Sequence, residues 1–339
     1  MNSPRPRLDP AVAATRLAVR TLLAQALTDA LVRPGDLVTV ALSGGADSLA
    51  LAAATAFEAP KQDLRAGAVV VDHALQAGSE AVATRASRQA ASLGLDPVTV
   101  RRVAVGSDGG PEGAAREARH TSIAEVAAAT GSPLVLFGHT LDDQAETVLL
   151  GLLRGSGPDA LSGMPPLARR TTGPAYGRPL LGLRRHTTRQ ACTAAGLVPW
   201  DDPQNDDPAY ARVRVRNTVV PTLERELGAG VPEALARTAE QLREDSAALD
   251  HFAEEMAEDL AEHAEAGISL SVAGLQANPP ALRQRLVRLA VEGEFGVTLS
   301  RSQTLEVCRL VTDWHGQGPI DLPGVRAARE GERIAFSAR

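Results

Sequence analysis

Residues 36–57 read DLVTVALSGGADSLALAAATAF, and they contain the clearest structural signal in the chain. An apolar run of strand length stops at Ser43, two glycines follow, and an alanine- and leucine-rich segment of helical composition begins. A glycine turn between a strand and a helix points backbone N–H groups and the positive helix end at one place, which makes an anion site. A kinase-type loop, GxxxxGK[ST], would add a lysine, and none follows here. The stretch therefore predicts a phosphate-binding loop of another kind.

Strand-like and helical segments alternate along the first half of the chain. After the opening stretch, strands are predicted at 66–73, 97–105 and 132–139, and helices at 79–94, 113–130 and 141–155. The strands are continuously apolar, which is typical of a parallel sheet covered by helices on both faces. Ligands bind such sheets beyond the carboxyl ends of the strands. We predict an α/β fold with a doubly wound, mostly parallel sheet and a site at that edge.

The second half has a different character. Residues 156–218 are rich in Gly, Pro and Arg, which predicts long loops with one short helix near 186–195. Leucine or methionine then recurs every seven residues from Leu235 to Met256 along an acidic segment, as in a surface helix packed in a second domain. Two more helices are expected within 281–312, and strands with a turn within 319–336. The predicted domains are 1–218, which carries the phosphate-binding loop, and 219–339, a helical linker with a small C-terminal domain.

Composition and charge narrow the class of protein. Hydrophobic residues make up 44% of the 339, yet no run of 18 uncharged apolar residues and no signal-peptide core is present. The two cysteines form no CxxC pair. We therefore expect a cytoplasmic protein without a membrane partner.

The net charge of −6 argues against a nucleic-acid partner, but the charge is segregated. Residues 161–200 carry six arginines and no acid, whereas 223–266 is strongly acidic. A locally basic surface is compatible with a phosphate-backbone partner; a loop region that merely lacks acids is the alternative.

Five motifs together carry a family resemblance. The SGGADS loop resembles the SGGxDS signature of the PP-loop ATP pyrophosphatases, which cleave ATP between its α and β phosphates. Elements of one member family, the tRNA(Ile)-lysidine synthases, are similar to VVVDHALQ (69–76), EGAAREARH (112–120), GHTLDDQAETVLLGLLRGSG (138–157) and DDPQNDDPAYARVRVRNTVVP (201–221). His120 replaces the usual tyrosine, and Gln204 a common serine. The resemblance covers roughly residues 35–220 and implies the PP-loop type of α/β fold.

The reaction that the resemblance implies joins L-lysine to cytidine 34 of tRNA(Ile) with a CAU anticodon. ATP first adenylates the C2 oxygen of the cytidine and releases pyrophosphate, and the lysine side-chain amine then displaces AMP. The implied ligands are ATP, Mg²⁺, L-lysine and tRNA(Ile), and a homodimer is one assembly it allows.

The candidate ATP-binding residues lie in the loop, at strand ends and on one helix. They are Ser43, Gly44, Gly45, Ala46, Asp47, Ser48, Asp72, His73, Arg116 and His139. Asp47 can hold a magnesium ion that bridges phosphates. Arg119 lies three residues after Arg116 on one helical face and is expected to stabilise the α-phosphate during transfer; pairing of these arginines with Glu112 or Glu117 is the structural alternative. A lone histidine such as His139 or His120 is more often structural.

Three acids begin the helix predicted at 141–155. Acids in a first turn commonly serve only as caps and dipole partners, but Asp143 and Glu146 lie on one face at the carboxyl end of a strand. With the resemblance, we assign both to lysine binding and amine orientation, because an amine with a pKa of about 10.4 must lose a proton before it attacks. Asp142 is a second candidate magnesium ligand.

Arginines are the candidate tRNA contacts. They are Arg154, Arg178, Arg212, Arg214 and Arg216. If residues 212–216 were extended, their alternation would place three guanidinium groups on one side, which suits a phosphate-lined groove. The anticodon loop is single-stranded, so cytidine 34 can be splayed into a pocket.

Three alternatives remain at this stage. A tRNA 2-thiolase shares the adenylation step but needs cysteines to carry sulfur or a cluster. A glutamine-dependent amidotransferase needs a glutaminase domain or an N-terminal cysteine, and position 2 is Asn2. A non-catalytic ATP- or RNA-binding protein would not need the acids beyond the phosphate loop.

Overall fold

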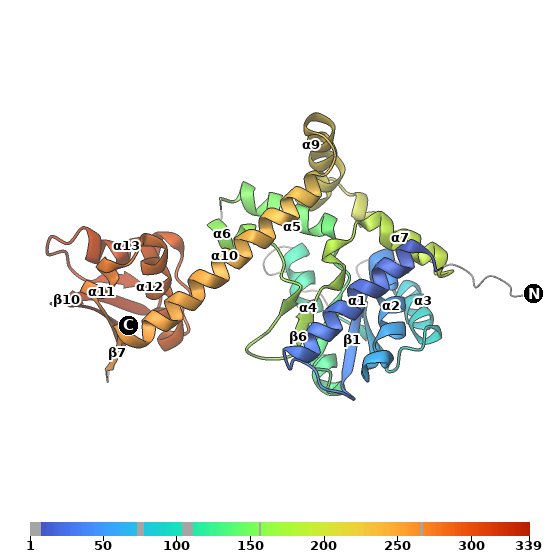
Figure 1. The fold of residues 1–339 in the computed structure, drawn as a ribbon, viewed down its shortest axis with the longest axis horizontal. Helices are drawn as coiled ribbons and strands as arrows, with labels where there is room; N and C mark the ends of the chain where they lie inside the picture. The colour runs from blue at the N-terminus through green and yellow to red at the C-terminus, as the bar shows by residue number, and fades with distance from the viewer. Residues whose placement is uncertain (1–7, 73–77, 104–110, 156, 265–266) are drawn as a thin grey trace, which may run out of the picture. The chain divides into compact units, whose positions relative to one another are not determined.

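A computed structural model describes residues 8–72, 78–103, 111–155, 157–264 and 267–339. The chain forms two compact units, Met1–Glu240 and Gln241–Arg339. Their boundary falls inside the long helix α10 (Val231–Leu260). Figure 1 shows the course of the chain through both units.

The first unit is built on a six-stranded sheet with the order β3-β2-β1-β4-β6-β5. Its strands are β1 (Leu37–Leu42), β2 (Arg65–Asp72), β3 (Val98–Arg102), β4 (Leu134–Phe137), β5 (Leu167–Ala168) and β6 (Ala175–Gly177). Neighbouring strands are parallel from β3 to β6, and β5 joins the edge antiparallel. The predicted mostly parallel sheet is confirmed. Strands β5 and β6 lie where long loops were predicted.

Helices cover both faces of this sheet. They include α1 (Pro10–Thr28), α2 (Ala46–Glu58), α3 (Ser79–Ser92), α4 (Pro111–Thr130) and α5 (Leu141–Leu153). Residues of α1, α2 and α3 form one buried cluster with Val38 and Val40 of β1. Residues of α4 form another with Val69 of β2 and Val135 of β4. Because each face has its own apolar cluster, the strands are buried on both sides, as their uninterrupted apolar sequence predicts.

The order of the strands locates the ligand edge. From β1 the chain runs outward through β2 to β3, and then returns so that β4 pairs with the free side of β1. The crossover direction therefore changes between β1 and β4, which is where open α/β sheets bind ligands. The carboxyl ends of these two strands lead directly into α2 and α5.

The segment after α5 contains more regular structure than predicted. It includes α6 (Gly157–Leu161), η2 (Pro179–Gly182), α7 (Arg185–Ala194), η3 (Pro203–Asp206), α8 (Ala211–Arg214), the π-helical turn η4 (Val215–Val219) and α9 (Val220–Leu227). Helix α7 confirms the short helix predicted near 186–195. The extended conformation considered for residues 212–216 is wrong, because this stretch is helical.

The second unit combines an antiparallel sheet with helices. The sheet has the order β7-β8-β11-β10-β9, from β7 (Ala261–Ala264), β8 (Gly267–Ser271), β9 (Ile320–Leu322), β10 (Val325–Glu330) and β11 (Arg333–Ala338). Helices α11 (Val272–Ala277), α12 (Pro280–Phe295) and α13 (Arg301–Thr312) share its apolar core. The β10–β11 hairpin confirms the strands and turn predicted within 319–336, whereas β7 and β8 were not predicted. Among the described residues, none of the helices has the length and apolarity that a membrane span requires.

Candidate active site

The phosphate loop connects β1 to α2 and is held by its own serines. Gly44 has φ +85°, a left-handed conformation that glycine adopts without strain. Ser43 N donates to Ser48 Oγ (3.2 Å), and Ser48 Oγ donates to Gly45 O (3.0 Å). The hydroxyls that the sequence predicts as phosphate donors therefore also fix the shape of the loop.

Gly138, directly after β4, allows the second strand end to approach this loop closely. A Cβ atom there would lie 2.9 Å from Asp47 C and 3.0 Å from Ser48 N, closer than real Cβ contacts. Only a residue without a side chain fits this approach. The loop after β4 is therefore packed onto the first turn of α2, which joins the phosphate loop to the acids of α5.

Asp47 lies between the phosphate loop and α7. Its carboxylate accepts a hydrogen bond from Thr188 Oγ1, and its Oδ2 lies 3.5 Å from Arg185 Nε. Burial raises the pKa of Asp47 above its ordinary value, and the hydrogen bond from Thr188 and the charge of Arg185 offset this only in part. A carboxylate whose charge is incompletely compensated is suited to a cation brought by a ligand.

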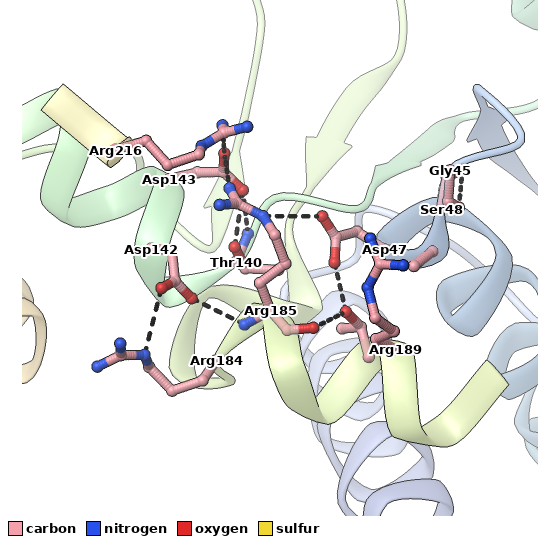
Figure 2. Close-up of polar contacts among 12 residues, drawn as sticks. Gly45, Asp47, Ser48, Thr140, Asp142, Asp143, Arg184, Arg185, Arg189 and Arg216 are labelled. Carbon is pink, nitrogen blue, oxygen red and sulfur yellow. Dashed lines mark hydrogen bonds and ion pairs between the residues drawn. The ribbon is translucent and has the colours of Figure 1, made fainter. Parts of the chain in front are cut away.

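Asp143 and Asp142, in the first turn of α5, make different hydrogen bonds and ion pairs. Asp143 Oδ2 accepts from Thr140 N and Thr140 Oγ1, each at 2.8 Å, and its Oδ1 lies 2.9 Å from Arg185 Nη2. Burial opposes ionisation of Asp143, but the charge of Arg185 and the bonds from Thr140 outweigh it and hold its pKa below the ordinary value. Asp142 accepts from Arg185 N (2.7 Å) and pairs with Arg184 Nε (3.3 Å). Figure 2 shows Arg185 between Asp47 and these two acids.

Glu146, one turn further along α5, is surrounded by arginines. Its side chain is 2% exposed. Arg216 binds it through Nε (2.7 Å) and Nη2 (3.1 Å), Arg212 Nε lies 3.3 Å away, and Arg185 Nη2 3.5 Å away. A buried carboxylate needs such partners to remain charged. The acids at this edge therefore form a cation-binding surface, and the cations that they contact in this structure are guanidinium groups of arginine.

The arginines predicted as one tRNA-facing row have different partners. Because residues 212–216 are helical, Arg212 and Arg216 lie four residues apart on the face towards Glu146. Arg214 instead donates to the carbonyls of Pro208 (2.7 Å) and Ala209 (2.8 Å). The expected alignment of all three on one side is therefore wrong. Arg154 is exposed at the end of α5, and Arg178 donates from Nη1 to Pro165 O (3.0 Å).

The histidine that follows Gly138 is neutral. Burial lowers the pKa of His139 to about 4, helped by the charges of Arg178, Arg212 and Arg119 against the opposing charge of Asp143. Its ring stacks on Phe137, with centroids 5.8 Å apart.

The remaining predicted residues lie around the same edge. His120 packs on Phe137 and Tyr176 (5.4 and 5.7 Å between centroids), so it serves as a ring in an apolar cluster. Asp72 is buried at the end of β2, and Arg119 is exposed on α4. His73 and the side chain of Arg116 lie outside the described residues.

Sequence reasoning missed three residues of the site: Arg184, Arg185 and Thr188. They lie at the start of α7, inside the acid-free stretch 161–200 that was noticed only for its charge. Arg184 also binds Glu233 Oε1 (3.0 Å), which ties the site to the beginning of α10. The available signal was that the arginines of 161–200 have no acids near them in the sequence, while the acids at the start of α5 have no Lys or Arg near them. Pairing between the two segments could have been predicted from this.

Comparison with known families agrees with this geometry. The family described as PP-loop domain matches residues 17–223, more than half of the chain. The chain is therefore a PP-loop protein, the class whose ATP-binding loop SGGADS resembles. A second family, described as TilS substrate binding domain, matches residues 270–334 in the second unit.

Curated relatives narrow the class. A tRNA(Ile)-lysidine synthase of Leifsonia xyli subsp. xyli is 62% identical over 304 residues, which cover 89% of this chain and 90% of that protein. One from Salinispora tropica is 51% identical over 96% of each chain. The chain belongs to the tRNA(Ile)-lysidine synthase family, and the resemblance indicated by its motifs is confirmed.

A solved structure supports the fold. The U34-tRNA thiolase NcsA from Methanococcus maripaludis, with its [4Fe-4S] cluster, superposes with a TM-score of 0.57 over 69% of this chain and 80% of that one. At 18% identity the likeness concerns the fold alone.

Proposed function

We propose that this chain joins L-lysine to C2 of cytidine 34 in tRNA(Ile) bearing a CAU anticodon, with ATP converted to AMP and pyrophosphate. The observation that carries the proposal is that one side chain, Arg185, contacts both Asp47 at the end of the phosphate loop and the buried acid pair Asp143 and Glu146. A two-step ligase needs both elements side by side, because the adenylated base must meet the amine in the same place.

The loop and its neighbours are proposed to bind the nucleotide. Backbone N–H groups at Gly44 and Gly45 and the start of α2 face the phosphates, and Arg119 is proposed to stabilise the α-phosphate during transfer. Asp72, His139 and Arg116 remain proposed neighbours of the nucleotide.

The residues fit a Mg²⁺ ion that arrives with ATP. Mg²⁺ commonly binds one or two carboxylates together with phosphate oxygens and water, and Asp47 places one incompletely compensated carboxylate at the loop. Within the described ranges, no group of three or more His, Cys, Asp and Glu side chains could hold a metal alone. Asp142 Oδ2 is held closely by Arg185 N (2.7 Å), whereas Asp47 Oδ2 lies 3.5 Å from Arg185 Nε, and this looser contact favours Asp47 as the protein ligand. When bound, the ion would neutralise phosphate charge.

Asp143 and Glu146 are proposed to bind the lysine ammonium groups and orient the attacking amine. Both carboxylates are buried at the carboxyl end of β4, next to the loop that holds the phosphates. A buried carboxylate attracts an ammonium strongly and can accept its proton. His139 has a pKa of about 4 and therefore contributes a neutral ring beside the acids.

The tRNA partner is supported by the second unit and by exposed arginines. The match to the TilS substrate binding domain supports a tRNA contact there. Arg154 and Arg214 are exposed and remain proposed phosphate contacts, together with Arg178, Arg212 and Arg216. We also propose a cytoplasmic location, where tRNA and ATP meet; a homodimer remains a prediction that light scattering can test.

The test uses the full chain with ATP, Mg²⁺, labelled lysine and a tRNA(Ile) transcript with a CAU anticodon. Label should enter the tRNA, and a transcript whose cytidine 34 is replaced by uridine should remain unlabelled. No incorporation by a folded sample contradicts the proposal.

The environments of Cys192 and Cys308 do not support the alternative that the chain is a tRNA thiolase. Burial raises the pKa of Cys192 to about 11, and its Sγ lies 3.2 Å from Ala46 O. Cys308 belongs to the core of the second unit, where burial likewise raises its pKa. Replacing both with serine should leave lysine incorporation in place.

A further inference from the structure

Arg185 connects the two halves of the active site. Its Nε lies 3.5 Å from Asp47 Oδ2 on α2, while its Nη2 lies 2.9 Å from Asp143 Oδ1 and 3.5 Å from Glu146 Oε1 on α5. Figure 2 shows this guanidinium between the carboxylates of Asp47 and Asp143. One side chain thus contacts both the phosphate loop and the acid pair.

The acid pair has limited capacity for another cation. Asp143 Oδ2 is taken by Thr140, so Oδ1, held by Arg185, is the oxygen with which it can meet a cation. Glu146 already has Arg212 and Arg216 in addition to Arg185. An ammonium group approaching both acids would lie against the guanidinium of Arg185, and two like charges in contact at a buried site repel strongly. Binding of lysine therefore requires this guanidinium to move.

We propose that Arg185 is a positioning residue whose guanidinium moves from the acid pair Asp143 and Glu146 to the triphosphate when the nucleotide binds. The lysine ammonium can then bind at the acids that the guanidinium has left. This inference rests on the proposed lysine-binding role of Asp143 and Glu146. It adds an order to the reaction: nucleotide first, lysine second.

The contacts single out Arg185 for this exchange. Arg216 contacts acids of α5, whereas Arg185 also reaches Asp47 at the start of α2, where the phosphates are proposed to bind. Guanidinium groups bind phosphate oxygens in a bidentate manner, and a triphosphate carries more charge than one carboxylate. The main chain is held meanwhile, because Arg185 N donates to Asp142 Oδ2 (2.7 Å). The guanidinium can therefore turn while the helix stays in place.

The acids are not left without cations after the exchange. Arg216 keeps its two bonds to Glu146, and Arg212 stays beside it. The lysine ammonium replaces the single guanidinium that has moved away. Total charge at the α5 acids is thus preserved, which avoids the large cost of an unpaired buried carboxylate.

The exchange predicts coupled binding. If nucleotide removes a competing cation from the acid pair, lysine must bind more tightly in its presence, and by linkage the nucleotide must bind more tightly in the presence of lysine. The experiment is a calorimetric titration of L-lysine into the full chain, with and without Mg²⁺ and α,β-methylene-ATP, which cannot be cleaved between its α and β phosphates. For the unmodified chain we expect the lysine Kd to fall by about ten-fold or more when the analogue is present.

Two variants show whether Arg185 carries the coupling. In Arg185→Gln the competing cation is gone, so the lysine Kd should differ by less than about two-fold with and without the analogue. Arg189→Gln is the matched control, one turn along α7, because its guanidinium pairs with the exposed Asp201 (Nη2–Oδ1 2.7 Å). It should keep the coupling of the unmodified chain.

The outcomes separate this inference from the proposed function. Equal lysine affinity with and without the analogue in the unmodified chain overturns the exchange, whatever the variants do. Full coupling retained in Arg185→Gln also overturns it. Because lysine incorporation into tRNA is measured on the same sample, a chain that incorporates lysine without coupling refutes the exchange alone, and one that incorporates none refutes the proposed function.

Discussion

Helix α2 carries a carboxylate at each end, half-buried Asp47 at its start and buried Glu58 at its end, and the pKa values of the two are shifted in opposite directions. At its start, Asp47 lies next to the phosphate loop, and burial raises its pKa. At its end, Glu58 is bound by Arg20 (Nε–Oε2 2.9 Å) and Lys61 (Nζ–Oε1 3.3 Å). The pKa of Glu58 is lowered, and the hydrogen bond from Arg20 is the main cause. One helix therefore has an incompletely compensated acid at the ligand edge and a fully paired acid at the opposite end.

The two acids differ in whether the scaffold supplies enough cations to compensate their charge. Glu58 has its cations supplied by α1 and by the turn after α2, so its pairing is complete within the scaffold. Asp47 shares Arg185 with the acids of α5 and keeps a raised pKa. Burial alone therefore does not separate these two acids; the raised pKa of Asp47, beside the lowered pKa of Glu58, marks Asp47 as the candidate functional group of the helix.

The largest expected effect is at the loop end of α2. Asp47→Ala should lower the rate of pyrophosphate release by about 1,000-fold, because it removes the carboxylate proposed to hold Mg²⁺ at the phosphates. Release of pyrophosphate from ATP in the presence of tRNA(Ile) measures this step. Glu58→Gln is the matched control on the same helix and should stay within about two-fold of the unmodified chain. If both variants lost pyrophosphate release to the same extent, the proposed difference in role between Asp47 and Glu58 would be wrong.

A second effect separates the two steps at the ligand edge. Glu146→Gln should lower lysine transfer by about 100-fold while adenylation stays within about three-fold, because Glu146 is proposed to act on the amine rather than on ATP. Single-turnover measurement of pyrophosphate release, which reports adenylation, and of lysine incorporation, which reports transfer, distinguishes the steps. If both steps fell together, the division of roles between α2 and α5 would be wrong.

At the end of α2, substitution of Glu58 should lower the thermal stability of the protein. Glu58→Gln removes the charge that Arg20 and Lys61 share, and we expect the melting temperature to drop by several degrees because hydrogen bonds to a charged group are lost. Calorimetry on the full chain measures the shift, with Gln62→Ala, in the same turn, as the control. A melting temperature unchanged in Glu58→Gln would mean that this pair contributes nothing.

The smallest expected effect is a difference in pH dependence. His139 has a pKa of about 4 in the folded chain against 6.5 ordinarily. Between these values the unfolded chain binds a proton that the folded chain does not, so stability falls as the pH drops from 6.5 towards 4. Between pH 8 and pH 5.5 this loss is about 1 kcal/mol. His139→Asn should flatten that part of the stability profile.

Glu58 provides the contrast in another pH window. Its pKa is lowered on folding, so its contribution is present above the ordinary value of 4.5 and is lost as the pH falls through the lower folded pKa. Denaturant unfolding at a series of pH values therefore separates the contribution of Glu58 from that of His139. A profile for His139→Asn with the slope of the unmodified chain between pH 6.5 and 5.5 would contradict the assignment.

Most of the first unit could be predicted because its signals are local. Each long strand and helix is specified by composition within about ten residues, and SGGADS specifies a glycine turn, an anion site and the start of a helix by its own chemistry. The short strands β5 and β6 escaped prediction, since two or three residues show no periodicity. Helical structure at 212–216 was missed because alternating arginines are equally compatible with a strand.

The fold class, the glycine turn after β1 and the acids at the start of α5 could all be predicted from local sequence. Which cations those acids contact depends on the tertiary fold. Arg185 lies 39 residues from Glu146 in the sequence and Arg216 lies 70, and no local pattern encodes a pairing at such separations. The reason is physical: backbone conformation follows from neighbours along the chain, whereas compensation of a buried charge depends on whatever the folded chain places within a few ångströms of it.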